Sequence, residues 1–304
     1  MRRIALAAAV AAALVLGGCG GDSGGSATTR ADPAKVPIRI GTKNFPEQFL
    51  LGELYKQALE AKGIPVELKA NIGSTEIIHQ ALTDGALDTY PEYIGVLLSE
   101  VANVRRRPAS PDGAYRRAAA FEAGNGFAML APTPFSDQNA LAVTPAYAQR
   151  HHVRQIADLK RVPGTVRIGA PPEFQTRFEG LVGLRQRYGL RNAEARPMAI
   201  GRQYAALDSG TVDAAAVFTT DGQLADERYV LLRDPQSVFG TQHVAPIISR
   251  TALSRYGPKL RTTMDTVSKR LTAAAMQKMN AQVQIDRRST AEVAGAFLRG
   301  EGLK

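Results

Sequence analysis

Apolar and polar residues follow two periods in the first third of the chain, and these periods predict alternating strands and helices. The segment VPIRIGTKN (residues 36–44) predicts a short strand that enters a turn. The segment FPEQFLLGELYKQALEAKG (residues 45–63) carries apolar residues at helical spacing, and Gly63 is a natural stop. A second strand over 66–74 and a second helix over 75–85 follow. The alternation predicts an α/β fold.

A short pattern occurs twice, as ALTDGALD at residues 81–88 and as ALDSGTVD at residues 206–213. Each copy predicts the end of a helix, a glycine in a left-handed cap and a short buried strand. Two α/β lobes built on one plan would explain both the repeat and the chain length, and a chance match is the alternative. The matching positions are Leu82, Gly85, Leu87 and Asp88 in the first copy, and Leu207, Gly210, Val212 and Asp213 in the second.

Aromatic and polar residues follow both copies, in TYPEYIG after Asp88 and in AAAVFTTDG after Asp213. In open α/β sheets, ligands bind outside the carboxyl ends of the strands. Both lobes therefore place such residues where a ligand is expected, and a cleft between two lobes is a common small-molecule site.

The N-terminus predicts export and lipidation. Residues 1–18 have a basic start, an apolar run that is short for a membrane span, and small residues before Cys19, the only cysteine of the chain. This layout resembles a bacterial lipobox, in which Cys19 becomes the lipid-bearing first residue of the mature protein. An ordinary signal peptide and a short anchor helix are the alternatives. Residues 19–35 are rich in Gly, Ser and Thr and predict a flexible tether before a body that begins near Val36.

Composition and motifs argue against several other classes of protein. The net charge is +10, but the basic residues are scattered, and the densest run is RRR at residues 105–107, without a recognisable nucleic-acid-binding motif. We therefore expect no nucleic-acid partner, and a basic surface that faces anionic lipid. The four histidines are scattered, and no HExxH, nucleophile elbow or phosphate loop occurs. We expect no enzyme activity, no metal and no cofactor; an exported hydrolase and an adhesin or structural lipoprotein are the alternatives.

Several segments together resemble the substrate-binding proteins of ABC importers for glycine betaine, choline and carnitine. The resemblance runs from about Ile38 to Leu303, and its most specific pieces are YPEYIG and TTDG. It implies a type II periplasmic-binding-protein fold, with lobe one over 36–133 and 243–304, lobe two over 134–242, and two crossover segments between them. It also implies a monomer that closes on a small solute by a hinge motion and then docks on ABC permease subunits.

In this family a cage of tyrosines holds a quaternary ammonium group, because a cation without N–H donors must be held by ring faces. Position by position, Tyr93 matches one cage tyrosine, whereas Asn139, Phe218 and Gln242 stand where tyrosines are usual. The implied ligand is glycine betaine, choline or a related quaternary ammonium compound. Because the two amides offer directed hydrogen bonds, a polyol, an aromatic or an amino-acid-like solute is the alternative.

Residues near two predicted helix starts complete the first half of the expected site. Asn44 and Gln48 follow the first strand, and Asn44 either caps the next helix or contacts the ligand. Ser74 or Thr75, at the start of the second helix, leaves backbone N–H groups that suit a carboxylate, with simple capping as the alternative.

The second half of the expected site lies in lobe two. Arg177 could hold an anionic ligand group, or form an ion pair with Glu173 or Asp221. Thr219 and Thr220 could donate to ligand oxygens, and Asp221 is expected to cap the next helix. In lobe one, Tyr93 is expected to face the cleft, and Tyr90 either the core or the hinge.

Overall fold

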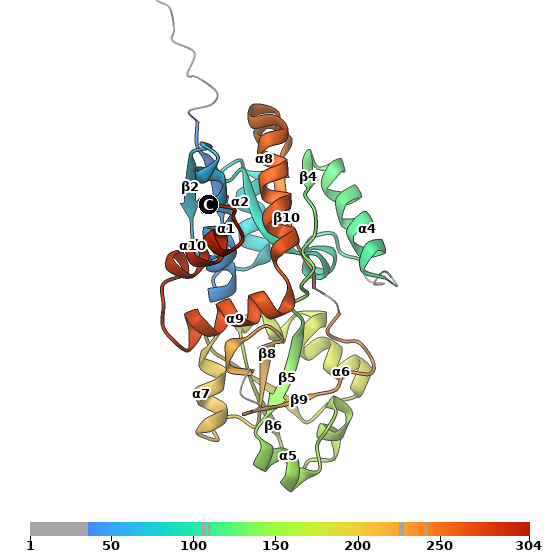
Figure 1. The fold of residues 1–304 in the computed structure, drawn as a ribbon. Coiled ribbons are helices and arrows are strands. Elements are labelled where there is room, and N and C mark those ends of the chain that lie inside the picture. The colour runs from blue at the N-terminus through green and yellow to red at the C-terminus, as the bar shows by residue number, and fades with distance from the viewer. Residues whose placement is uncertain (1–35, 105–107, 109, 225–227, 241) are drawn as a thin grey trace, which may run out of the picture. The chain divides into compact units, whose positions relative to one another are not determined.

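A computed structural model describes residues 36–104, 108, 110–224, 228–240 and 242–304. Within these residues the chain forms two five-stranded sheets with helices around each (Figure 1). The predicted signal peptide, the tether and Cys19 lie outside the described residues, as does the basic run 105–107.

The first sheet is mixed and has the order β2-β1-β3-β10-β4. β1 pairs in parallel with β2 and β3, whereas β10 runs antiparallel to both β3 and β4. We call this sheet with its helices lobe one. Its strands are β1 (Ile38–Gly41), β2 (Val66–Lys69), β3 (Thr89–Tyr93), β4 (Phe127–Met129) and β10 (Val244–Ser249).

The second sheet repeats this plan in the order β7-β6-β8-β5-β9. β6 pairs in parallel with β7 and β8, and β5 runs antiparallel to both β8 and β9. We call this sheet with its helices lobe two. Its strands are β5 (Asn139–Val143), β6 (Val166–Ala170), β7 (Ala193–Pro197), β8 (Ala214–Phe218) and β9 (Val230–Leu232).

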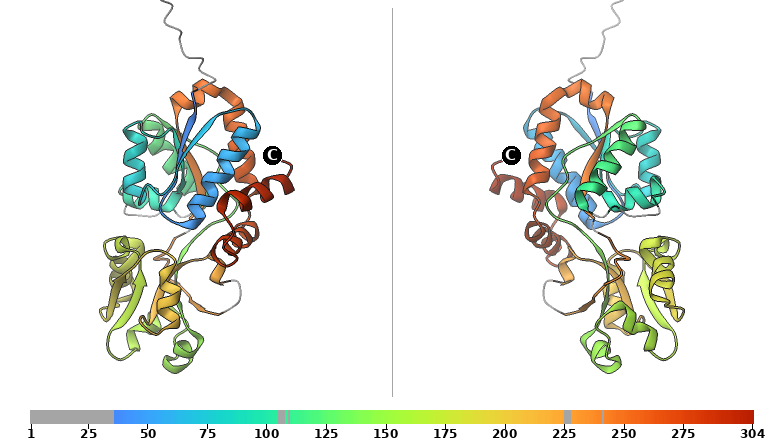
Figure 2. Two further views of the ribbon diagram at one scale, coloured as in Figure 1. Left: turned by 90° about the vertical axis from the view of Figure 1, so that its left-hand side faces the viewer. Right: turned by 90° about the vertical axis from the view of Figure 1, so that its right-hand side faces the viewer.

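Helices cover both faces of the first sheet, with α1 and α8 on one face and α2 and α4 on the other (Figure 2). The helices of lobe one are α1 (Pro46–Ala61), α2 (Thr75–Thr83), α3 (Ile94–Val96), the π-helical turn η2 (Leu97–Val101), α4 (Pro111–Gly124), α8 (Arg250–Arg270), α9 (Ala273–Gln284) and α10 (Thr290–Gly300). Those of lobe two are α5 (Pro145–His151), η3 (Ile156–Arg161), η4 (Pro172–Gln175), η5 (Phe178–Val182), α6 (Gly183–Tyr188), α7 (Arg202–Asp208) and η6 (Gly222–Leu224).

The sequence repeat corresponds to one structural unit in each lobe. In lobe one, α2 ends before Gly85, which has a φ of 72°, and β3 follows. In lobe two, α7 ends before Gly210, which has a φ of 68°, and β8 follows. Only glycine adopts this left-handed conformation without strain, which explains its presence in both copies. The repeat is therefore structural rather than a chance match.

The repeated aspartates make the same contacts in both lobes. Asp88 accepts hydrogen bonds from the backbone N–H and the guanidinium of Arg39, on β1. Asp213 accepts the same set from Arg167, on β6. Each arginine also donates to the carbonyl oxygen of the preceding repeat glycine. The unit thus ties the start of β3 to β1 in lobe one, and the start of β8 to β6 in lobe two.

Two crossover segments connect the sheets, one between β4 and β5 and one between β9 and β10. The fold is therefore the two-lobed periplasmic-binding-protein architecture that the sequence predicts. Helix α9, the last but one in the chain, also packs against η6 of lobe two, where a Cβ atom on Gly222 would lie 2.5 Å from the backbone of Ala281. Among the described residues, no helix combines the length and the apolar character that crossing a bilayer requires.

Candidate functional site

A pocket of about 690 Å³, partly open to solvent, brings together residues of both lobes. Aromatic residues in its lining are Phe45, Tyr93, Phe174 and Phe218, and charged ones are Lys43, Glu100, Asp137, Glu173, Arg177 and Glu179. The remaining lining residues are Asn44, Ser74, Thr75, Val96, Asn139, Pro171, Ile200 and Gln242.

The topology explains why the four predicted cage positions meet in this pocket. Tyr93 is the last residue of β3, and Phe218 is the last residue of the equivalent strand β8. Asn139 begins β5 and pairs in register with Phe218. Val244, two residues after Gln242, pairs in register with Tyr93. All four positions therefore lie at strand ends around one cleft.

Eight of the eleven residues predicted to contact the ligand line this pocket, and Gln48, Thr219 and Thr220 do not. Gln48 is buried behind the pocket, where its side chain accepts from the backbone N–H of Lys43 at 3.3 Å and donates to the carbonyl of Pro91 at 3.1 Å. The hydroxyl of Thr219 accepts from the backbone N–H of Gln138 at 2.9 Å. Both side chains support the site from outside its surface.

Three aromatic rings form a wall across the pocket. The ring of Phe45 stacks on Tyr93 with centroids 5.9 Å apart, and on Phe218 with centroids 5.4 Å apart and an interplanar angle of 12°. Phe45 and Tyr93 come from lobe one, whereas Phe218 comes from lobe two. Sequence reasoning missed Phe45, although its place directly after the turn that follows the first strand is a signal that could have found it.

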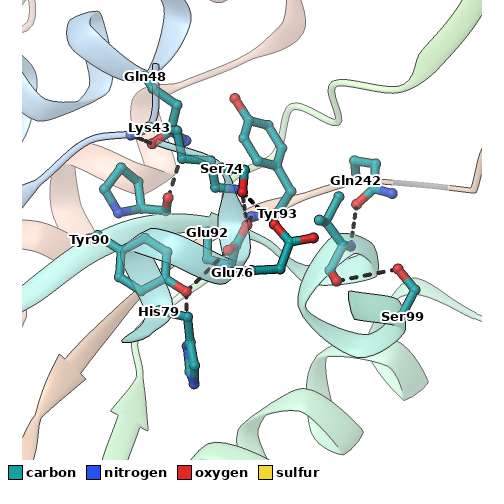
Figure 3. Close-up of polar contacts among 12 residues, drawn as sticks. Lys43, Gln48, Ser74, Glu76, His79, Tyr90, Glu92, Tyr93, Ser99 and Gln242 are labelled. Carbon is teal, nitrogen blue, oxygen red and sulfur yellow. Dashed lines mark hydrogen bonds and ion pairs between the residues drawn. The ribbon is translucent and has the colours of Figure 1, made fainter. Parts of the chain in front are cut away.

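Lys43 is the second lining residue that sequence reasoning missed. Its ammonium group lies 4.7 Å from the centroid of the Tyr93 ring and forms a buried ion pair with Glu92 (Figure 3). Burial lowers the pKa of Lys43, and the neighbouring Glu92 carboxylate opposes this shift. Glu92 also accepts from the backbone N–H of Tyr93 at 2.5 Å, so the ion pair helps to hold this ring.

Two amides bind one carboxylate in the same pocket. Asn139 donates to Glu179 at 3.3 Å, and Gln242 donates to the same oxygen at 2.5 Å. Glu179 lies at a backbone kink, followed by Gly180, where a Cβ atom would meet the carbonyl oxygen of Phe174 at 2.2 Å. The glycine permits this close approach. Asn139 and Gln242, which stand where the family has cage tyrosines, thus form a polar cluster around Glu179. Glu179 is another lining residue that the sequence analysis did not identify.

Arg177 makes an ion pair that the sequence analysis did not foresee. Its guanidinium contacts Glu76 of α2 in lobe one and lies 3.7 Å from the carboxylate of Glu100, also in lobe one. The expected partners Glu173 and Asp221 are not the ion-pair partners that the described contacts give. Burial works against ionisation of Glu76, but hydrogen bonds from Ser74 and Arg177 lower its pKa to about 2. Arg177 therefore connects the lobes beside the pocket.

The remaining expectations are resolved by local contacts. Tyr90 lies in the core, because residues three apart on a strand face opposite sides, and its hydroxyl contacts His79 at 3.1 Å and Glu92 at 3.1 Å (Figure 3). Asn44 does not cap α1, since the N-cap residue is Phe45, without a side-chain cap bond. The expectation that Asp221 caps a helix is wrong, because its carboxylate accepts from Tyr204, Gln284 and the backbone N–H of Phe218.

Ser74 occupies the N-cap position of α2 without a side-chain cap bond. Its hydroxyl instead donates to Glu76 at 2.5 Å, and Thr75 is buried directly behind it. Within the described part of the chain, no group of three or more histidine, cysteine or acidic side chains is placed to hold a metal ion.

Comparison with known proteins identifies the class. The chain matches the model of the OpuAC family, the substrate-binding domain of ABC-type glycine betaine transport systems, over residues 36–300. The chain belongs to this family, whose members are extracytoplasmic transport binding proteins and not enzymes. Members bind a small solute and work with an ABC permease.

Particular relatives and structures agree with this assignment. The chain is 33% identical to the glycine-betaine-binding protein of Pseudomonas aeruginosa, over 86% of this chain and 87% of that one. It is 26% identical to the ergothioneine transport permease/ergothioneine binding protein EgtU of Helicobacter pylori, over 88% of this chain and 48% of that one. The apo structure of YehZ from Escherichia coli superposes with a TM-score of 0.65 at 27% identity, covering 88% of this chain and 99% of that one.

Proposed function

We propose that the protein captures glycine betaine or a closely related quaternary ammonium compound between its two lobes and delivers it to an ABC permease. The observation that carries the proposal is the wall of Phe45, Tyr93 and Phe218, contributed by both lobes. A trimethylammonium group has no N–H donor, so ring faces are the surfaces that can attract it.

A charged residue of the same pocket suits the other end of such a ligand. Arg177 lines the pocket and carries N–H donors from which a carboxylate can accept, beside the ion pair that it forms with Glu76. The trimethylammonium group of such a ligand would therefore meet the aromatic rings, and its carboxylate would meet Arg177. On this basis glycine betaine is favoured over choline, which carries a hydroxyl instead of a carboxylate.

Isothermal titration calorimetry with glycine betaine, its methyl ester and choline tests this proposal. The three ligands share the trimethylammonium group, and only glycine betaine carries the carboxylate. We expect glycine betaine to bind most tightly, and Phe218→Ala to weaken all three. Equal affinity for the three would refute the carboxylate contact, and no binding of any would refute the assignment of the ligand.

A second candidate keeps the transport role but changes the ligand. The cluster of Asn139, Gln242 and Glu179 offers directed hydrogen bonds in place of two rings. This favours a solute with N–H or O–H donors, such as an amino-acid-like or aromatic compound or a polyol. Binding of such a solute by the wild type, with loss of affinity in Asn139→Ala and no binding of glycine betaine, would support this candidate.

We also propose that Cys19 carries the lipid that tethers the exported, monomeric protein to the outer face of a membrane. The support is the sequence of residues 1–35, which lie outside the described structure. Cys19→Ala should move the protein from the membrane fraction to the soluble fraction of cells. Unchanged fractionation would contradict the anchor, and sedimentation of the detergent-solubilised wild type tests the monomer.

A further inference from the structure

One buried carboxylate receives hydrogen bonds from both lobes directly behind the aromatic wall. Glu47, in the first turn of α1, accepts from the hydroxyl of Tyr93 at 2.8 Å and from the hydroxyl of Thr220 at 2.5 Å. It also accepts from the side-chain amide of Asn280, on α9, at 2.7 Å. Only 3% of Glu47 is exposed, so these donors replace solvent almost completely.

The three donors come from parts of the molecule with different roles. Tyr93 lies in lobe one and presents its ring to the ligand pocket. Thr220 lies in lobe two, just after β8, and is itself 2% exposed. Asn280 also donates to the backbone carbonyl of Thr220 at 2.9 Å. Glu47 is thus the point at which the pocket wall, lobe two and helix α9 meet.

Two further acidic residues lie close to Glu47, so its carboxylate is destabilised unless its three hydrogen-bond donors are in place. Asp137, in the first crossover segment, accepts from the backbone N–H of Thr220 at 3.3 Å, and Asp221 follows Thr220 in the chain. Burial, together with repulsion from Asp221, raises the pKa of Glu47, and burial, together with repulsion from Glu47 and Asp221, raises the pKa of Asp137. The ammonium group of Lys43 lies over the face of the Tyr93 ring, 4.7 Å from its centroid, and pairs with Glu92 rather than with Glu47. A buried carboxylate needs hydrogen-bond donors to offset its lost hydration.

We propose that Glu47 is the positioning residue that couples ligand contact at Tyr93 to closure of the two lobes. When the lobes separate, Thr220 moves away with lobe two, and Glu47 loses one of its three donors. When a ligand packs on the ring of Tyr93, it fixes the hydroxyl that holds Glu47 in place for Thr220. The inference goes beyond the proposed function, because it concerns the motion and holds for any ligand that packs on Tyr93.

A simpler role for Glu47 would be stability alone, since an acidic residue in the first turn of a helix favours that helix. The two roles differ in what they predict for the ligand-free protein. A residue that only stabilises α1 changes the unfolding midpoint and leaves the distance between the lobes unchanged. A residue that couples the lobes changes that distance.

The test measures the distance between the lobes by double electron–electron resonance on the full chain. Spin labels are attached at Lys62→Cys in lobe one and Arg191→Cys in lobe two, both exposed, with the native cysteine removed by Cys19→Ser. The variants are Glu47→Gln, which removes the charge, and Thr220→Val, which removes the donor of lobe two and keeps the shape. Thr211→Val, the same substitution at an exposed position of lobe two, is the control.

We expect both variants to shift the ligand-free distribution toward longer distances, and the control to match the unmodified protein. With glycine betaine as the probe, both variants should weaken affinity about tenfold, the effect of losing one charge-assisted hydrogen bond. Unchanged distances with lowered unfolding midpoints would overturn the inference. If the wild type does not bind glycine betaine, the proposed ligand is wrong, and the ligand-free distances alone decide the role of Glu47. If Glu47→Gln fails to fold, the distances measured in Thr220→Val decide whether Glu47 couples the two lobes.

Discussion

The guanidinium of Arg177, in lobe two, donates from one nitrogen to both carboxylate oxygens of Glu76, in lobe one, at 2.9 and 2.8 Å. This contact joins lobe two to lobe one beside the pocket, through side chains that are not part of the aromatic wall. It therefore contributes to holding the lobes together independently of the aromatic wall. The side chain of Glu76 is 45% exposed, so solvent and salt weaken the interaction.

Removing this contact should weaken ligand binding modestly and make it less dependent on salt. We expect Glu76→Gln to lower the affinity for glycine betaine by about threefold at low ionic strength, the size of a partly exposed ion pair. The difference from wild type should disappear near 1 M salt. Glu60→Gln, which breaks an exposed pair with Lys56 inside α1, is the matched control. A salt-independent difference between Glu76→Gln and wild type in calorimetry would contradict this account.

The aromatic wall predicts that Phe45 is as important for binding as the tyrosine that the sequence identifies. Phe45→Ala and Tyr93→Ala should each weaken the binding of glycine betaine at least about tenfold, because a desolvated cation–ring contact is worth ~1–2 kcal/mol. Calorimetry on both variants checks this. Tyr90→Phe, on the opposite face of the same strand, should leave the affinity unchanged. Wild-type affinity in Phe45→Ala would remove this ring from the site.

The matched aspartates predict a graded loss of stability. Asp88→Ala removes three hydrogen bonds from Arg39, and we expect a loss of about 1–2 kcal/mol after allowance for solvent screening. Asp213→Ala removes the equivalent bonds from Arg167, and the loss should be smaller, because the side chain of Asp213 is 19% exposed against 6% for Asp88. Urea unfolding measures both. The reverse order would show that burial does not set the strength of this repeated unit.

The buried carboxyl group of Glu122 should make the free energy of unfolding fall as the pH rises. Its buried carboxylate oxygens have no hydrogen-bond donor among the described contacts, and the nearest ring, His79, lies 4.0 Å away. Burial, with a smaller contribution from Glu92, raises its pKa to about 7. From about pH 4.5 to 7 the unfolded chain ionises this group and the folded protein does not, so stability from this group falls as pH rises.

Replacing Glu122 should therefore stabilise the folded protein most at high pH. We expect Glu122→Gln to stabilise the protein by about 2 kcal/mol more at pH 8 than at pH 5, relative to wild type. Unfolding midpoints at the two pH values measure the difference, and Glu194→Gln, an exposed side chain in lobe two, is the control. A pH-independent effect would mean that Glu122 is ionised in the folded protein throughout this range.

Local pattern was sufficient to predict the first two strands and helices and the repeated unit. The helical spacing after Phe45 predicted α1, and the glycines at 85 and 210 predicted the two caps, because these features depend on neighbours in sequence. Resemblance to a family supplied the four cage positions. The structure adds the reason they meet, which is that Tyr93 and Phe218 end equivalent strands.

Contacts between distant segments could not be predicted in the same way. The pairing of Arg177 with Glu76 depends on how the two lobes face each other, and local sequence carries no information about this. The same holds for Glu179, which enters the pocket through a backbone kink before Gly180. The sequence predicts Gln48 in the pocket from its place after the first strand, and Thr219 from the polar segment that follows a predicted strand of lobe two. A neighbour in sequence can point behind the site, and both of these do.

The most direct test of the proposed function is the thermal unfolding of the purified protein with and without glycine betaine, beside the variant Phe218→Ala. A ligand at one hundred times its dissociation constant stabilises the folded state by about 2.7 kcal/mol. We predict a clear rise in the melting temperature of the wild type, and little or none in the variant. No rise with glycine betaine or any other quaternary ammonium compound, or an equal rise in the variant, would contradict capture of such a ligand by the aromatic wall.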